Sequence, residues 1–343
     1  MGNVEEAVDA VFARPDDQGI TLALVVSVDG EVVAERYGRQ PANAFQDALD
    51  VTADTTLISW SMAKSMVHAA VGVLVGDGLL DPEAPAPVRE WQGTPKQAIR
   101  LLDLLEMRSG LQFVEDYVDG AVSDCLEMLY GEASADMAAY AAGLPGVHEP
   151  GTVFNYSSGT TNIVSRIIGD VVYGGNAGGA AGSPAGRRAA MEEFLHTRLF
   201  GPLGMTTASP KFDGAGTWVG SSYVYATARD FAKFGELYRT DGVLPDGTRL
   251  LPPGWVAHAR TFAAHDPGDG LLPNGTDYGR HWWMWPEYPG CLVAQGYEGQ
   301  YIGVFPDRRL TLAHLGKTAA DQRHHLVRRL HDVVDAVTPV TCR

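Results

Sequence analysis

Two β-rich segments at opposite ends of the chain constrain its fold more than any other feature. Residues 20–38 form two apolar, β-branched runs joined at Asp29-Gly30, a dipeptide typical of hairpin turns. Residues 300–316 repeat this pattern, and residues 319–337 follow with the apolar spacing of a helix. A sheet must therefore be assembled from both ends of the chain.

The segment between these ends has a different character. It contains five stretches with helical periodicity, separated by Gly and Pro: residues 61–75, 97–107, 134–142, 160–173 and 187–200. We therefore predict an α+β fold, with an antiparallel sheet flanked by helices and an inserted, mostly helical subdomain. The α/β subdomain would comprise residues 1–55 and 215–343 and the helical subdomain residues 56–214, together one unit over residues 1–343. The Gly- and Ala-rich residues 173–188 are expected to form a surface loop.

The composition narrows the classes of partner. A chain of 343 residues with 45% hydrophobic content can build a large core. Its formal net charge of -16 disfavours binding to nucleic acid and to anionic membrane surfaces. No apolar run reaches the roughly 18 residues needed to cross a bilayer. We therefore expect neither nucleic acid nor a membrane as a partner, while the oligomeric state stays open.

Cysteine usage and the N-terminal residues indicate the cellular compartment. Cys125, Cys291 and Cys342 are an odd, scattered set without a CxxC motif, which favours free thiols over disulfides or a zinc site. The first residues contain early acids and no apolar stretch of signal-peptide length, so they are typical of an amphipathic helix. We expect a cytoplasmic protein without a bound metal.

A serine and a lysine lie three positions apart in an otherwise apolar run. Ser61 and Lys64 occupy positions i and i+3 within residues 57–70, so they project from the same side of a helix. A serine hydroxyl needs an adjacent base to act as a nucleophile, and burial favours the neutral form of a lysine that can serve as one. An isolated pair of this kind is more often a capping serine and a solvent-facing lysine. The case for catalysis therefore depends on further residues.

A second candidate element follows in residues 149–170. Tyr156 and Ser158 lie in a turn before an apolar helix. Beside a lysine, the tyrosine phenol could carry the proton that the serine loses and the leaving group gains. Without such a neighbour, Tyr156 would be interpreted as an ordinary half-buried tyrosine.

These motifs, in this order and spacing, resemble the serine β-lactamase and penicillin-binding-protein superfamily. The motifs are SxxK from Ser61 to Lys64, YxS from Tyr156 to Ser158, and the late segment "GYEGQYIGVFPDRRLTLAHLG". Supporting stretches are "LLDLLEMRSGL", "EPGTVFNYSSG", "LFGPLGM" and "YATARDFAKFG". They are similar to the branch that holds class C β-lactamases, D-aminopeptidases, family VIII esterases and 6-aminohexanoate-oligomer hydrolases. The resemblance implies a β-lactamase/transpeptidase-like fold.

The resemblance also implies an acyl-enzyme mechanism that needs no cofactor. Ser61 would attack the carbonyl of a small-molecule ester or amide, with Lys64 as base. Tyr156 would assist this base and deliver a proton to the leaving group. Ser158 takes the place where many relatives carry asparagine, and it would hydrogen-bond near Lys64. The oxyanion hole would combine the backbone N–H groups of Ser61 and Gln300.

The sequence departs from this superfamily on the strand that lines the site. Its β-lactamases and DD-peptidases carry Lys-Thr-Gly or His-Thr-Gly there to bind a substrate carboxylate, whereas this chain has Tyr297-Glu298-Gly299. A glutamate facing the site would repel a carboxylate and could attract an amine or hydrogen-bond a neutral substrate. Penicillin-like substrates are therefore not expected. The later Lys317-Thr318 lacks the glycine, and we assign it to the entry of the last helix.

Aromatic residues late in the chain are candidates for the walls of a cleft. Three tryptophans occur within residues 278–285, and we expect Trp282 or Trp283 to lie at the site, although packing in the sheet core would explain such residues equally well. Tyr223 is a further candidate for a pocket wall. His68, on the same helix as the candidate base, is expected to be a packing residue.

Several functions follow from these motifs. The sequence contains no GxSxG, HExxH or GxxxxGK[ST], which argues against an α/β-hydrolase, a zinc protease and a P-loop enzyme. We favour a serine hydrolase acting on an ester or amide. An acyltransferase would share the first half of that reaction and pass the acyl group to a small-molecule amine or alcohol. A binding protein that kept the fold and lost its activity is a third hypothesis, and β-lactamase activity is a weaker fourth.

Overall fold

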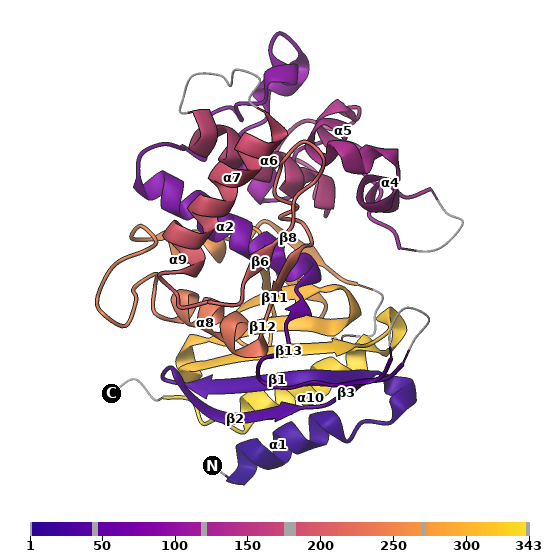
Figure 1. Cartoon of the computed structure of the whole chain (residues 1–343), viewed down its shortest axis with the longest axis vertical. Helices are drawn as coiled ribbons and strands as arrows, with labels where there is room; N and C mark the ends of the chain where they lie inside the picture. The colour runs from indigo at the N-terminus through magenta and orange to yellow at the C-terminus, as the bar shows by residue number, and fades with distance from the viewer. Residues whose placement is uncertain are drawn as a thin grey trace.

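The protein has two parts, which the computed structural model in Figure 1 shows as a sheet with flanking helices below a cluster of helices. The structure describes residues 2–42, 47–117, 122–174, 183–268, 272 and 274–340. Residues 175–182, which are half of the loop predicted at residues 173–188, and the third cysteine, Cys342, lie outside the described residues. At both ends of that predicted loop the chain is helical instead, at residues 173–174 and 184–188.

The helices and strands have the following bounds. The α-helices are α1 (Gly2–Phe12), α2 (Ala63–Gly76), α3 (Leu101–Leu105), α4 (Asp124–Tyr130), α5 (Met137–Gly143), α6 (Ser158–Gly174), α7 (Pro184–Leu195), α8 (Ala228–Arg239), α9 (Trp255–Ala259) and α10 (Arg323–Asp335). The strands are β1 (Ile20–Val28), β2 (Glu31–Tyr37), β3 (Arg39–Gln40), β4 (Leu49–Asp50), β5 (Leu57–Ile58), β6 (Ser209–Pro210), β7 (Val224–Ala226), β8 (Ala264–Asp266), β9 (Thr276–Tyr278), β10 (Trp283–Met284), β11 (Leu292–Gly296), β12 (Gln300–Phe305) and β13 (Leu310–Lys317). Two short 3-10 turns matter for the site, η2 (Trp60–Met62) and η7 (Tyr297–Gly299).

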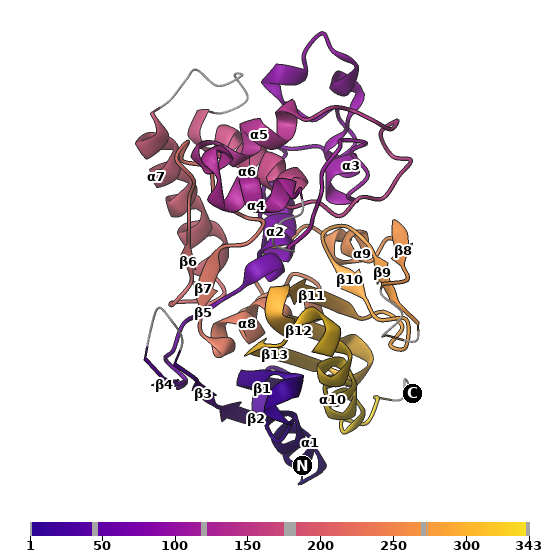
Figure 2. The same cartoon turned by 90° about the vertical axis from the view of Figure 1, so that its right-hand side faces the viewer.

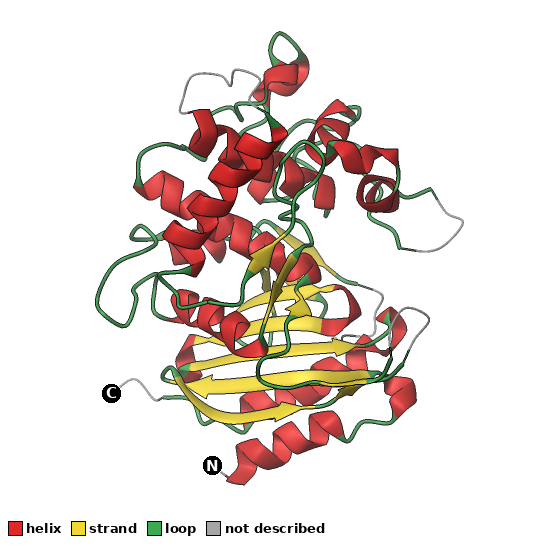
Figure 3. Cartoon of the chain, viewed as in Figure 1, coloured by secondary structure: helices red, strands yellow, loops and turns green. Residues whose placement is uncertain are grey.

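The main sheet is antiparallel and joins the two ends of the chain (Figure 3). Its strand order is β2-β1-β13-β12-β11-β10-β9-β8, and two small sheets, β3-β4 and β5-β7-β6, stand apart from it. Strand β1 pairs with β13, with Leu24 opposite His314. The β1-β2 hairpin turns at Asp29 and Gly30, whose φ angles are 54° and 84°. The predicted assembly of the sheet from both ends of the chain is confirmed.

Helices cover both faces of this sheet, because its buried strands carry apolar side chains on both sides. Leu24 and Val26 of β1 belong to a core shared with α1 and α10. Ala23 and Val25 point to the opposite face and share a larger core with α2 and α8. The larger core continues into the helical part, so the two parts have a continuous apolar interior.

Helix α2 lies between the sheet and the helical part (Figure 2). All residues from 63 to 74 are buried, which accounts for the continuous apolar run in the sequence. Polar side chains on such a helix must find partners within the protein. His68 does so through the hydroxyl of Tyr238, 2.7 Å away, and through Nδ1 of His258, 3.1 Å away. It is therefore a packing histidine. Within the described residues, no helix has the length and apolar character needed to cross a membrane.

Candidate active site

Ser61 lies at the sharp entry to helix α2. It occupies the 3-10 turn η2 directly before the α-helix, and the preceding Trp60 has a left-handed φ of 43°. The turn is anchored by Ser59, whose hydroxyl donates to the carbonyl of Ser222 at 3.1 Å and accepts from the N–H of Val224 at 3.1 Å. Left-handed backbone is strained for a large side chain, so these anchors hold Ser61 in a fixed position.

Lys64 is buried one turn after Ser61 and has a full set of partners. Its Nζ lies 2.9 Å from the Oγ of Ser61, 2.9 Å from the Oγ of Ser158 and 3.0 Å from the carbonyl oxygen of Ser221. These three oxygen atoms suit the amine in both of its forms, since an ammonium group donates three hydrogen bonds, and a neutral amine donates two and accepts one from a hydroxyl group. The side chain is 2% exposed, so Lys64 is fixed next to Ser61 rather than extended to solvent.

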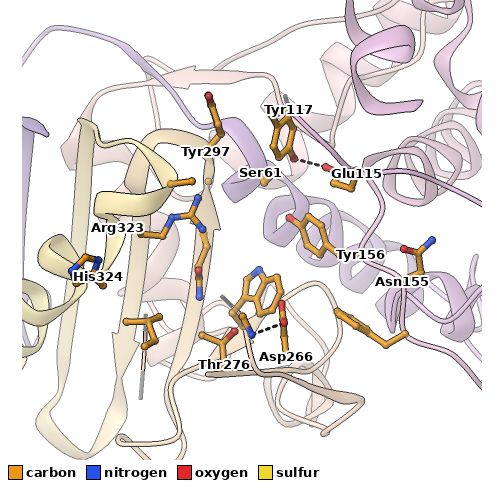
Figure 4. A pocket seen from close by; sticks show the side chains of 17 residues that line it. Ser61, Glu115, Tyr117, Asn155, Tyr156, Asp266, Thr276, Tyr297, Arg323 and His324 are labelled. Atoms are coloured by element: carbon orange, nitrogen blue, oxygen red, sulfur yellow. Dashed lines mark hydrogen bonds between the residues drawn. The ribbon is translucent and has the colours of Figure 1, made fainter. Parts of the chain in front are cut away.

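Tyr156 completes the predicted group. The Nζ of Lys64 lies 4.8 Å from the centroid of its ring. The ring is held by two aromatic neighbours, Trp283 at 5.3 Å and Tyr278 at 5.9 Å between centroids. Its hydroxyl end is directed towards Ser61 (Figure 4). The structure thus brings Ser61, Lys64, Tyr156 and Ser158 together.

Glu115 is a member of the site that the sequence analysis missed. Its carboxylate accepts the N–H of Ser158 at 2.7 Å and the hydroxyl of Ser158 at 2.6 Å. It also accepts the hydroxyl of Tyr117 at 2.5 Å. The carboxylate therefore lies at the N-terminus of α6, where the helix dipole favours negative charge. One hydroxyl group separates this anion from the amine of Lys64.

A second missed residue, His281, fixes the helices around Lys64. It has a left-handed φ of 57°. Its Nδ1 lies 2.9 Å from the carbonyl of Leu105 and its Nε2 lies 3.0 Å from the hydroxyl of Thr161. Its own carbonyl accepts the hydroxyl of Ser65, next to Lys64, at 2.7 Å. Burial lowers the pKa of His281 to about 4, so the ring is neutral at physiological pH.

A cleft of about 530 Å³ opens beside Ser61 (Figure 4). Arg323 and His324, from the start of α10, form a basic stretch of its wall, and Asp266 lies on another part of the wall. Within the described residues, the Nε2 of Gln295 and the Nε of Arg323 are buried without a hydrogen-bond partner. These two N–H groups are enclosed by the protein, so they are not donors that a molecule in the cleft could reach.

Glu298 does not face this cleft, contrary to the sequence prediction. It has a left-handed φ of 61°, and its carboxylate lies 3.4 Å from the indole nitrogen of Trp60 and 3.9 Å from the Nζ of Lys317. The left-handed residue turns the side chain away from the cleft, and Tyr297 lines the wall instead. The argument that Glu298 repels a carboxylate at the site is therefore wrong.

Gly299 and Gln300 are also structural parts of this turn rather than parts of the cleft wall. Gly299 has a φ of 82°, and a Cβ there would lie 2.7 Å from Leu326. The buried side chain of Gln300 binds both backbone groups of Gly316, through Nε2 at 2.8 Å and Oε1 at 3.0 Å. The sequence prediction placed the strand residue at the site three positions too late, since Tyr297 is the turn residue beside Ser61.

Of the aromatic candidates, Trp283 lines the cleft and the other two do not. Trp282 is 0% exposed and packs in the core against Phe234, at 6.0 Å, and Tyr238, at 4.5 Å. Neighbouring residues of an extended chain point to opposite sides, which is why only one of the pair reaches the cleft. Tyr223 lies behind Trp60, with ring centroids 6.0 Å apart, so it supports the nucleophile turn instead of lining this cleft.

The part of the chain that the structure describes has no cluster of His, Cys, Asp and Glu suited to holding a metal ion. Cys125 and Cys291 are free and buried. Burial raises the pKa of each thiol to about 12, so both are protonated at neutral pH. Ser61, Lys64 and Tyr156 therefore stay the predicted reactive groups at the cleft.

Comparison with known proteins agrees with this geometry. The sequence matches the family described as Beta-lactamase over residues 7–335. The 6-aminohexanoate-dimer hydrolase of Paenarthrobacter ureafaciens is 28% identical over 325 residues, which cover 87% of this chain and 74% of that protein. Two solved structures, each 17% identical, share the fold. They are the octameric penicillin-binding protein homologue from Pyrococcus abyssi (TM-score 0.69, covering 98% of this chain and 78% of that chain) and a family VIII carboxylesterase (TM-score 0.64, covering 98% and 96%). The fold is thus β-lactamase/transpeptidase-like, as the motifs implied, and the chain belongs to the Beta-lactamase family.

Proposed function

We propose that this protein is a serine hydrolase that cleaves an ester or amide bond through an acyl-enzyme on Ser61. The observation that carries the proposal is the contact between the buried Nζ of Lys64 and the Oγ of Ser61, 2.9 Å apart at the edge of an open cleft. A nucleophile and a base within hydrogen-bond distance are the minimum that acyl transfer requires.

The reaction would proceed in two halves. The Oγ of Ser61 bonds to the substrate carbonyl carbon while its proton passes to Lys64. The carbon–oxygen or carbon–nitrogen bond then breaks, Tyr156 gives its hydroxyl proton to the leaving alcohol or amine, and Lys64 returns the serine proton to Tyr156. In the second half, water attacks the acyl carbon, its proton returns through the same groups, and the Ser61 hydroxyl is restored. The backbone N–H groups of Ser61 and Tyr297 would stabilise the negative oxygen in both halves.

Glu115 would support the same step without touching the substrate carbonyl. When Lys64 takes up the serine proton it becomes a cation, and the carboxylate lies one hydroxyl group away through Ser158. An anion held close to a developing cation in a buried site lowers the energy of that state. Glu115 would therefore be a positioning and electrostatic residue for Lys64.

Linear amides whose leaving amine is an amino acid are the first substrates to test. The relative from Paenarthrobacter ureafaciens is named for the hydrolysis of such an amide dimer. The cationic side chain of Arg323, which lines the cleft, suits an oxygen-rich group on such a substrate. The buried free thiols fit a reducing compartment, so the proposal includes a cytoplasmic location.

The proposal is tested by trapping the acyl-enzyme. The protein and its Ser61→Ala variant would be incubated with a fluorophosphonate and with p-nitrophenyl esters, followed by intact-mass spectrometry and turnover assays. We expect one adduct on the protein, none on the variant, and loss of ester turnover in the variant. An unmodified, inactive protein would favour the binding-protein hypothesis, and full turnover by Ser61→Ala would refute the assignment of the nucleophile. Added amines that yield acylated amine instead of acid would favour an acyltransferase.

A further inference from the structure

Two separate hollows meet at Ser61. The first is the cleft of about 530 Å³ described above, and the second is a pocket of about 100 Å³ on the other side of the nucleophile. Ser61, Tyr117 and Tyr297 line both. The rings of Tyr117 and Tyr297 touch, with centroids 5.1 Å apart, so these two tyrosines form the partition between the hollows.

The small pocket has an aromatic and aliphatic lining. Beyond the partition, its wall comprises Trp60, Cys125, Leu126, Leu129, Tyr130 and Ser222. Most of these residues come from helix α4, so the pocket lies between the nucleophile turn and the helical part. Pockets with this kind of lining bind apolar groups.

The position of Tyr156 indicates which hollow receives the leaving group and which receives the acyl group. Tyr156 lines the large cleft and is not part of the small pocket's wall. A general acid must lie within reach of the atom that it protonates, and in acyl transfer that atom belongs to the leaving group. The leaving group must therefore depart into the large cleft, which leaves the small pocket for the acyl side.

On this basis we propose that the small pocket is an acyl-binding pocket that selects short, unbranched aliphatic acyl groups, while the large cleft accepts a bulky, polar alcohol or amine. This inference rests on the proposed serine hydrolase function. In the first half of the reaction, the Ser61 Oγ–acyl bond forms with the chain in the small pocket. The bond to the leaving group breaks on the side of Tyr156, and the leaving group departs with its proton into the large cleft.

The volume of the pocket sets the length of the chain. An apolar cavity of about 150 Å³ holds benzene, or about 25 Å³ for each carbon. The pocket of about 100 Å³ then holds about four carbons. A p-nitrophenyl group has nine heavy atoms, so it fits the large cleft and not the small pocket. Acetyl to butanoyl esters of p-nitrophenol should therefore bind in the productive direction, and octanoyl esters should not.

The test is an acyl-length series on three proteins. p-Nitrophenyl acetate, butanoate, hexanoate and octanoate would be assayed with the protein and with two variants, Leu126→Ala and Leu126→Trp. Leu126 is only partly buried, so both variants are expected to fold. Phe154→Ala is the matched control, because Phe154 lines the large cleft alone. The readout is the ratio of kcat/KM between acyl lengths, which does not depend on the overall activity of a variant.

We expect butanoate to exceed octanoate by at least about tenfold in the unmodified protein, since a few methylene groups that do not fit a pocket have an effect of this size. Leu126→Ala should shift the optimum towards hexanoate, Leu126→Trp should shift it to acetate, and Phe154→Ala should leave it at butanoate. A flat series, an octanoate optimum, or an optimum that follows Phe154 and ignores Leu126 would overturn the acyl-pocket assignment. These results all require turnover, so they differ from complete absence of a Ser61 acyl-enzyme, which would overturn the proposed function itself.

Discussion

Replacing Glu115 by glutamine isolates the contribution of its partly buried carboxylate. The glutamate accepts four hydrogen bonds, two from Ser158, one from the hydroxyl of Tyr117 and one from the thiol of Cys125. Glutamine keeps one of the two acceptor oxygens. Its other terminal atom is an NH2 nitrogen, which cannot accept a hydrogen bond from the groups that the carboxylate binds. At least one charge-assisted bond is therefore lost, together with the negative charge near Lys64. Such a bond contributes about 1.5–3 kcal/mol.

In the proposed mechanism, Lys64 becomes a cation when it takes up the serine proton. The loss of the carboxylate charge should therefore raise the energy of that state more than the energy of the resting enzyme. Glu115→Gln should therefore reduce kcat/KM by about 10- to 150-fold, since 1.36 kcal/mol corresponds to a factor of ten. The assay is steady-state hydrolysis of p-nitrophenyl butanoate by Glu115→Gln, accompanied by denaturant unfolding to measure stability.

Asp230 supplies a matched control far from the cleft. Its carboxylate accepts the N–H of Thr207 at 2.8 Å and the hydroxyl of Thr207 at 2.7 Å, and it pairs with Lys233 at 2.8 Å. Asp230→Asn thus removes the same kind of contact from a more deeply buried carboxylate. It should lower the free energy of unfolding to a similar extent and leave kcat/KM within about twofold. An unchanged kcat/KM in Glu115→Gln, or an equal loss in Asp230→Asn, would refute the link between Glu115 and Lys64.

Further predictions concern packing and pH. Trp282→Ala should reduce the free energy of unfolding by about 3–5 kcal/mol in denaturant titration, whereas Trp283→Ala should lower ester turnover at least about tenfold with a smaller loss of stability, because it removes a support of the catalytic tyrosine; equal effects on both properties would contradict this division. Gly72→Ala should destabilise by about 1–3 kcal/mol, since the new Cβ would lie 2.3 Å from the indole nitrogen of Trp255, and an unchanged thermal midpoint would show that the helix can shift. The pKa of His281 is lowered to about 4 in the folded protein, so the unfolded chain binds more protons below pH 6.5, and stability should fall by about 3 kcal/mol as pH drops from 6.5 through 4. His281→Asn should flatten the pH dependence of unfolding in that window, and an unchanged slope would disprove the assignment.

The catalytic group was predictable because its members are fixed by short-range spacing. Ser61 and Lys64 lie within one turn at the start of α2, so the motif places both on one side of it, and Tyr156 lies two residues before Ser158, in the turn that leads into α6. Glu115 gave no comparable signal. Acidic side chains make up 42 of the 343 residues, and Glu115 reaches Ser158 only through the tertiary fold, 43 residues along the chain. Its role depends on long-range packing that no local pattern encodes.

The turn before β12 shows a different limit of sequence reasoning. The start of the strand at Gln300 was predicted correctly. The prediction placed Glu298 on the side of the turn that faces the cleft, whereas Tyr297 lies there. Glu298 and Gly299 both have left-handed φ angles, which reverse the direction of the chain within three residues. Glycine permits this conformation, whereas glutamate gives no sign of it in the sequence. The residue at the cleft is consequently Tyr297, and the side chain expected to select the substrate instead pairs with Lys317.

The hydrogen-bonded chain through Lys64 links the chemistry to the shape of the pockets. It runs from Ser61 to Lys64, Ser158 and Glu115 and ends at the hydroxyl of Tyr117, whose ring forms part of the partition between the two hollows. An acyl group that fills the small pocket therefore packs against the same tyrosine that orients the carboxylate. Because that carboxylate supports the base, a correctly sized acyl group should raise kcat and not only lower KM. Substrate selection and proton transfer would then depend on a single network of buried polar groups.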